Sequence, residues 1–151
     1  MSRIRIVVAD QAEAIFYDTG SLTARPVEAG RMADPAAHLH NRDFTSDRPG
    51  RSYESVGAAR HAIQRENDPR QREAIRFARE IARTLEEARR NGEFDQLIMV
   101  AGPSFLGLMR AELSPPTKVC VVHEVHKDLV HSPPEALLQH LPQSPAGLKS
   151  A

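Results

Sequence analysis

The sequence predicts an α/β fold, a mixed five-stranded sheet with flanking helices. Five short runs have the composition and length of strands, and the longest regular stretch has the apolar period of an amphipathic helix. Three of the strand-like runs come first in the chain, and the other two alternate with helical segments. The expected architecture is therefore an antiparallel meander followed by two helix–strand units.

The first three strands are predicted at Ile4–Ala9, Glu13–Asp18 and Leu22–Glu28. The first run is apolar and short, as expected of a buried strand. Tight connections join the three, and Gly20 suits the turn between the second and the third. Pro26 cannot donate a hydrogen bond to a ladder, which predicts that the third strand lies at an edge or carries a bulge.

The clearest element is a long helix predicted at Pro69–Asn91. Asp68 is a favourable N-cap residue, Pro69 suits the first helical position, and Gly92 ends the helix. One face of this helix is apolar and consists of Ala74, Phe77, Ala78, Ile81, Leu85 and Ala88.

Two strands and two short helices complete the order. The strands are predicted at Leu97–Ala101 and Lys118–Val125, and the helices at Ser104–Leu113 and from Ser132 through Leu141. The resulting strand order, 3-2-1-4-5, matches the ribonuclease-H-like topology, in which strand 1 is central.

Length and composition indicate one soluble domain. The chain has 151 residues, with 20 Lys and Arg against 20 Asp and Glu, and this zero net charge argues against a general polyanion binder. We expect a domain at residues 1–131 with a long arm at about 30–67, then a short C-terminal helix and frayed tail at 132–151. One cysteine excludes an internal disulfide framework. The absence of a long apolar run and of a signal peptide predicts a cytoplasmic protein without a membrane anchor.

Candidate catalytic residues are sparse. Asp10 follows the first strand, where a nuclease of this topology holds a metal-binding acid, and Glu73 or Glu80 could supply the helix acid. The fourth strand ends without a carboxylate, so the simpler interpretation is that Asp10 caps the turn between strands 1 and 2.

Histidines and nucleophiles give no stronger signal. Ser104 lacks a nucleophile-elbow motif, and Cys120 is expected to be a small core residue within a strand. The histidines show no zinc-binding spacing, so neither a metal nor a cofactor is predicted. They are His38, His40, His61, His123, His126, His131 and His140.

The arm combines arginines with a Pro-Gly turn. Residues 31–65 contain six arginines against four acidic residues, Asp34, Asp43, Asp47 and Glu54. One interpretation is a phosphate-binding arm with a stacking tyrosine; the other is an arm ordered by Asp–Arg pairs, which covers the domain or forms a dimer. The nucleic-acid-binding candidates are Arg42, Arg48, Arg51, Tyr53, Arg60 and His61.

Several motifs resemble the bacterial host attachment protein family, whose members are described as required for attachment to host cells. The signature stretches are residues 41–53 and 57–62, and later motifs resemble residues 73–78, 105–107 and 127–131. The opening Val8-Ala9-Asp10 also fits. The likeness extends from about Arg3 to His131.

The resemblance implies a relationship to the middle domain of archaeo-eukaryotic release factors, and hence a possible partnership with the ribosome or tRNA. That middle domain places a Gly-Gly-Gln loop for peptidyl-tRNA hydrolysis between its meander and its first long helix. Here Gly57 to His61 hold that position without a Gly-Gly-Gln sequence.

Three functions therefore stay open from the sequence. The first is a translation-linked binding domain without proven catalysis. The second is a hydrolase of peptidyl-tRNA or another ester, in which Gly57, His61 and, more remotely, Asp10 are the candidate residues. The third is a protein-interaction or dimerisation module, assisted by the edge of the third strand.

Overall fold

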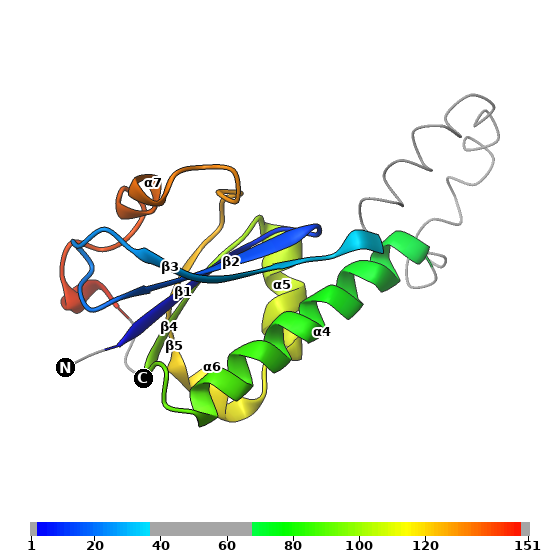
Figure 1. Cartoon of the computed structure of the whole chain (residues 1–151), viewed down its shortest axis with the longest axis horizontal. Helices are drawn as coiled ribbons and strands as arrows, with labels where there is room; N and C mark the ends of the chain where they lie inside the picture. The colour runs from blue at the N-terminus through cyan, green and yellow to red at the C-terminus, as the bar shows by residue number, and fades with distance from the viewer. Residues whose placement is uncertain (1–2, 37–67, 149–151) are drawn as a thin grey trace.

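A computed structural model of the chain describes residues 3–36 and 68–148. Its single sheet has five strands in the order β3-β2-β1-β4-β5, which confirms the predicted α/β class and strand order (Figure 1). The closer likeness to ribonuclease H or to release factors stays a prediction. The elements are β1 Ile4–Ala9, β2 Glu13–Thr19, β3 Val27–Ala33, α4 Pro69–Arg90, β4 Gln96–Val100, α5 Pro103–Glu112, α6 Pro115–Cys120, β5 Val121–Val125, α7 Pro134–Leu138 and the 3-10 turn η4 Pro145–Gly147.

Strand β1 forms the centre of the sheet. It pairs antiparallel with β2 and parallel with β4, while β3 and β5 are the outer strands. All six residues of β1 are buried, as expected for an apolar strand that is covered on both faces. The meander and the parallel pair therefore meet at β1.

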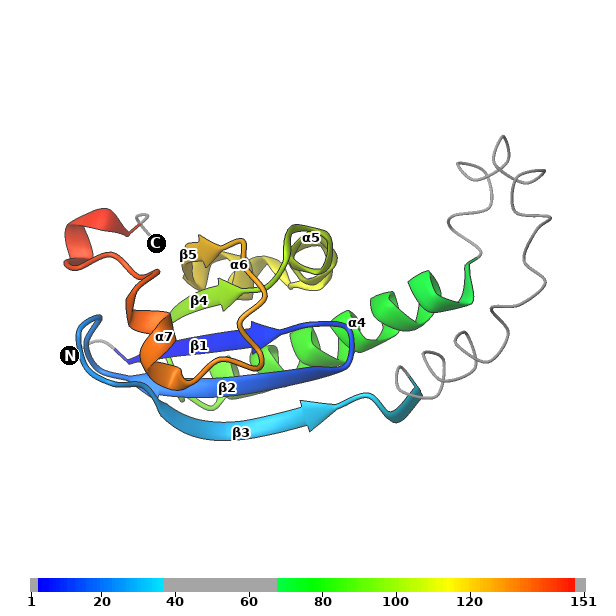
Figure 2. The same ribbon diagram turned by 90° about the horizontal axis from the view of Figure 1, so that it is seen from above.

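The two faces of the sheet bury separate apolar clusters. Helices α4, α5 and α6 cover one face, where Phe77 and Leu85 of α4 pack with Val7 and Met99 of the sheet. The other face carries α7 and the C-terminal residues, with Leu137 and its neighbours against β1 and β2 (Figure 2).

The predicted long helix is confirmed. The side chain of Asp68 accepts a hydrogen bond from the backbone N–H of Arg70 at 3.0 Å, and the helix ends with Asn91 as its C-cap. Gly92 follows with φ of 74°, a left-handed conformation that glycine adopts without steric cost.

The predicted bounds of the third strand were wrong. Residues 22–26 form a bend and an extended approach, and β3 begins only at Val27, after Pro26. Five of its seven residues are exposed. The sequence of this strand therefore lacks the alternation of apolar and polar residues from which its bounds could have been predicted. Residues 30–33 of the predicted arm therefore belong to β3, and its residues 37–67 lie outside the described residues.

The prediction of a strand at Lys118–Val125 was also wrong for its first three residues, which belong to a helix. Pro115 and Pro116 begin the short helix α6, in which the N–H of Lys118 donates to the carbonyl of Ser114 at 2.9 Å. Strand β5 begins at Val121. The local preference of proline for a helical start thus outweighs the β-branched character of the sequence.

The C-terminal region contains less helix than the sequence predicts. Helix α7 ends at Leu138 rather than near Leu141, and the tail includes the turn η4, with Leu141 buried against the sheet. Within residues 3–36 and 68–148, no helix combines the length and apolarity needed to cross a bilayer.

Candidate functional site

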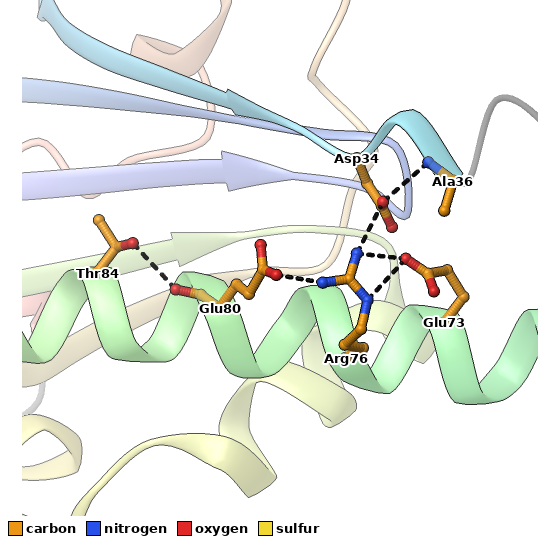
Figure 3. A network of polar contacts seen from close by, with 6 residues as sticks. All are labelled: Asp34, Ala36, Glu73, Arg76, Glu80 and Thr84. Carbon is orange, nitrogen blue, oxygen red and sulfur yellow. Dashed lines mark hydrogen bonds and ion pairs between the residues drawn. The ribbon is translucent and has the colours of Figure 1, made fainter.

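The residues predicted to carry nucleic-acid binding lie outside the described part of the chain. These are Arg42, Arg48, Arg51, Tyr53, Arg60 and His61, together with Gly57, and their roles stay predictions. The structure does describe the two places where their segment joins the fold. The end of β3 and the start of α4 lie side by side at one end of the molecule (Figures 1 and 3).

Four charged residues tie these two places together, and we call them the clasp: Asp34, Glu73, Arg76 and Glu80. Arg76 is central, because its Nη2 lies 3.0 Å from Oδ1 of Asp34 and 2.5 Å from Oε2 of Glu73 (Figure 3). Its Nη1 pairs with Glu80 one turn further along α4. The end of β3 is thereby fixed to α4 at the base of segment 37–67.

Asp34 is the buried member of the clasp. Its side chain is fully buried, and its Oδ1 also accepts a hydrogen bond from the N–H of Ala36 at 3.1 Å. Its Oδ2 has no hydrogen-bond donor among the described residues when both carboxyl groups are ionised. Burial raises the pKa of Asp34, the hydrogen bond and negative charge of Glu73 raise it further, and Arg76 opposes the rise. Two carboxyl groups can share a hydrogen bond only if one holds a proton, so this pair favours proton uptake.

The start of α4 carries charges of both signs. Its first turn contains Arg70 and no acidic residue, and Arg72 follows closely, while the N-cap residue is Asp68. The N-terminus of a helix already carries a partial positive charge, so these arginines lie where they add to it rather than offset it. The carboxylate of Asp68 already uses part of this preference for anions, because it accepts a hydrogen bond from the N–H of Arg70.

Most other arginines of the described part are paired with carboxylates. Arg79, for example, pairs with Glu112 at 3.0 Å, and Arg110 pairs with Glu124 at 2.7 Å. Further pairs are Arg5–Asp18, Arg5–Glu93, Arg25–Glu135, Arg31–Glu28 and Arg90–Glu86. Much of the arginine charge of the described part is therefore offset by a neighbouring carboxylate.

A second feature is a pocket of about 370 Å³ at the carboxyl ends of the parallel strands β1 and β4. Asp10, Ser104 and Asp128 line it, together with Phe105. The structure thus brings together Asp10 and Ser104, which the sequence separates widely. Asp10 is engaged by the backbone, since its Oδ1 accepts from the N–H groups of Ala12 and Glu13 at 2.8 and 2.9 Å. This confirms that it caps the turn between β1 and β2.

A family model described as "Protein required for attachment to host cells" matches residues 5–141. The chain belongs to this host attachment family. No curated protein matches the chain. The match includes the clasp, the pocket and the undescribed segment, so all the candidate sites of this family member lie within its family region.

The remaining nucleophile candidate of this host attachment protein was predicted to lie within a strand, and this prediction was wrong. Cys120 is the last residue of α6 rather than a strand residue, is only partly buried, and donates from Sγ to the carbonyl of Pro116 at 3.6 Å. Burial raises its pKa, which disfavours the reactive thiolate.

The histidines of the family member that the structure describes are dispersed. His123 lies in β5, and His126 lies 3.8 Å from Glu124 just beyond that strand. Within residues 3–36 and 68–148, no three side chains of His, Cys, Asp or Glu converge as metal ligands would.

Sequence reasoning missed the clasp. The spacing of Glu73, Arg76 and Glu80 by three and four residues was a readable sign of pairing along α4. The contact of Asp34 with Arg76 spans 42 positions, and no local pattern announces it. In the sequence, Asp34 is only one of the four acidic residues of the predicted arm.

Proposed function

We propose that this host attachment family member binds RNA where segment 37–67 joins the fold, at the end of β3 and the first turn of α4, and we call this end of the described fold the pole. The observation that carries the proposal is the clasp. It ties the chain just before an arginine-containing segment to the first turns of the 22-residue helix that follows this segment. The ribosome and tRNA are the partners that we assign to this pole.

Charge supports this location over others. The segment itself holds Arg42, Arg48, Arg51 and Arg60, and Arg70 and Arg72 follow at the helix start. These six arginines belong to one continuous stretch of the sequence, residues 42–72. A chain with zero net charge can bind a polyanion only where its positive charge is concentrated.

The binding mode follows from the residue types. Arginine places paired N–H groups against phosphate oxygens, and Tyr53 supplies a ring on which an unpaired base can stack. Phosphate contacts give affinity with little sequence preference, so we expect the protein to bind structured RNA broadly.

Salt titration of binding to a fluorescent tRNA tests the proposal. Each phosphate contact contributes about 0.7 to the slope of log affinity against log salt for single strands. The double variant Arg70→Gln/Arg72→Gln removes two such contacts and is therefore expected to lower that slope by about 1.4 and to weaken binding at low salt.

The matched control changes two arginines at the other end of the same helix. Arg83→Gln/Arg90→Gln removes the same charge but lies away from the pole, and it should leave both slope and affinity near the wild-type values. An equal loss in both double variants would show that binding follows overall charge, and the proposed pole would be abandoned.

A further inference from the structure

The outer edge of β3 offers unpaired backbone groups. Within residues 3–36 and 68–148, β2 is its only partner strand, and the ladder is interrupted by a register shift opposite Phe16 and Tyr17. From Gly30 to Ala33 the pairing is regular. Figure 2 shows β3 at the border of the sheet. A regular exposed edge of this kind can accept a further strand.

A groove of about 540 Å³ runs between this edge and the second half of α4. Phe16, Met32 and Ala88 give it an apolar lining. Gly30 widens it, because a Cβ atom added there would meet no atom within 4 Å. Gly30 also lacks a positive φ, so the backbone does not require glycine at this position. The space beside Gly30 is therefore open to a side chain from outside.

Carboxylates dominate one end of the groove. Arg5 has only 8% of its side chain exposed, and its guanidinium holds Asp18 at 2.7 Å and Glu93 at 3.2 Å. Asp18 and Glu93 each keep close to half of their side chains exposed. Glu87, on α4, adds a third carboxylate, and no described side chain pairs with it.

Positive charge in the groove does not balance these three acids. Arg5 is buried behind Asp18 and Glu93, and it supplies one charge against two. Arg31 also lines the groove, but its Nε and Nη2 are bonded to Glu28 at 2.6 and 3.1 Å. The groove therefore favours a cation.

We propose that β3 and this groove bind an extended peptide segment of another protein that carries a lysine or arginine. The peptide backbone pairs with Gly30–Ala33 as a sixth strand, and alternate side chains face α4. One of these fills the space beside Gly30, and its charged end lies among Glu87, Glu93 and Asp18. The groove lies beside the C-terminal half of α4, while the paired stretch of β3 ends at Ala33, next to Asp34 of the clasp.

The test uses the full chain and a fluorescein-labelled peptide, Thr-Val-Arg-Val-Thr, with binding followed by anisotropy. We expect saturable binding that is lost when glutamate replaces the arginine or when alternate peptide amides are N-methylated. The first change reverses the charge, and the second removes backbone donors from the added strand. Equal binding of all three peptides would overturn the proposal.

Two variants locate the peptide on the protein. Gly30→Leu fills open space without strain and should weaken binding at least tenfold, whereas Gly107→Leu, at an equally open glycine on α5, should not. Glu87→Gln should weaken binding about two- to fivefold, as expected for an exposed ion pair. Unchanged binding in Gly30→Leu, with the far-UV spectrum of the wild type, would exclude the groove.

The mass of the protein in solution tests the other candidate occupant of this edge, a second copy of the chain. A dimer that dissociates in Gly30→Leu would show that a second copy of the chain covers β3, and the peptide proposal would fail. We expect a monomer for both proteins across the concentrations used for peptide binding.

Discussion

Replacing Phe77 by alanine is expected to lower the free energy of unfolding by about 3–5 kcal/mol. Phe77 has no exposed surface, and it lies at the centre of α4 between the sheet and α5. Its ring centroid is 6.2 Å from that of Phe105, so the substitution removes contacts with both layers at once. Urea unfolding followed by circular dichroism measures the loss.

The control for this prediction is Val27→Ala at the start of β3. Val27 is 68% exposed, and its truncation should change stability by no more than about 0.5 kcal/mol. A loss below about 1 kcal/mol for Phe77→Ala would mean that α4 does not pack on the sheet as described.

Replacing Arg76 by alanine is expected to cost about 2 kcal/mol of unfolding free energy at neutral pH. The substitution leaves the buried carboxylate of Asp34 beside Glu73 without its cation. Burial already raises the pKa of Asp34, and removing Arg76 raises it further, because this guanidinium opposes the rise. Urea unfolding across a pH series is the measurement.

The raised pKa of Asp34 determines how the free energy of unfolding changes with pH. An acid whose pKa is raised on folding binds its proton more tightly in the folded state, so stability rises as the pH falls through the raised pKa. The loss of unfolding free energy in Arg76→Ala should therefore become smaller as the pH falls toward 3.8, the ordinary pKa of aspartate. Below that pH, Asp34 is protonated in both the folded and the unfolded state. Arg79→Ala, which breaks an exposed pair with Glu112, should show a small deficit. An Arg76→Ala deficit that grows on acidification would contradict the account of the clasp.

The parts of the fold that the sequence predicts are those with strong local signals. Strand β1 is a continuous apolar run, and α4 has a cap, a stripe and a stop within one stretch. These two elements fix the centre of the sheet and its main covering helix. The order of the strands then follows from short connections and right-handed crossovers.

The errors arise where exposure or a turn overrides local preference. Strand β3 is mostly exposed, so no alternation of apolar and polar residues indicates its bounds. The two prolines before Thr117 begin the helix α6, although β-branched residues follow them. The candidate site was harder still. Both the clasp contact of Asp34 with Arg76 and the groove beside Gly30 join elements that are distant in sequence.

Co-sedimentation with bacterial ribosomes tests the central claim of RNA binding most directly. The wild-type protein should pellet with ribosomes at low salt and be released as salt increases. The triple variant Arg48→Ala/Arg51→Ala/Arg60→Ala should stay in the supernatant, while Arg83→Gln/Arg90→Gln should pellet like the wild type. Pelleting of the triple variant at the wild-type level, or no pelleting of the wild type at low salt, would contradict the proposed function.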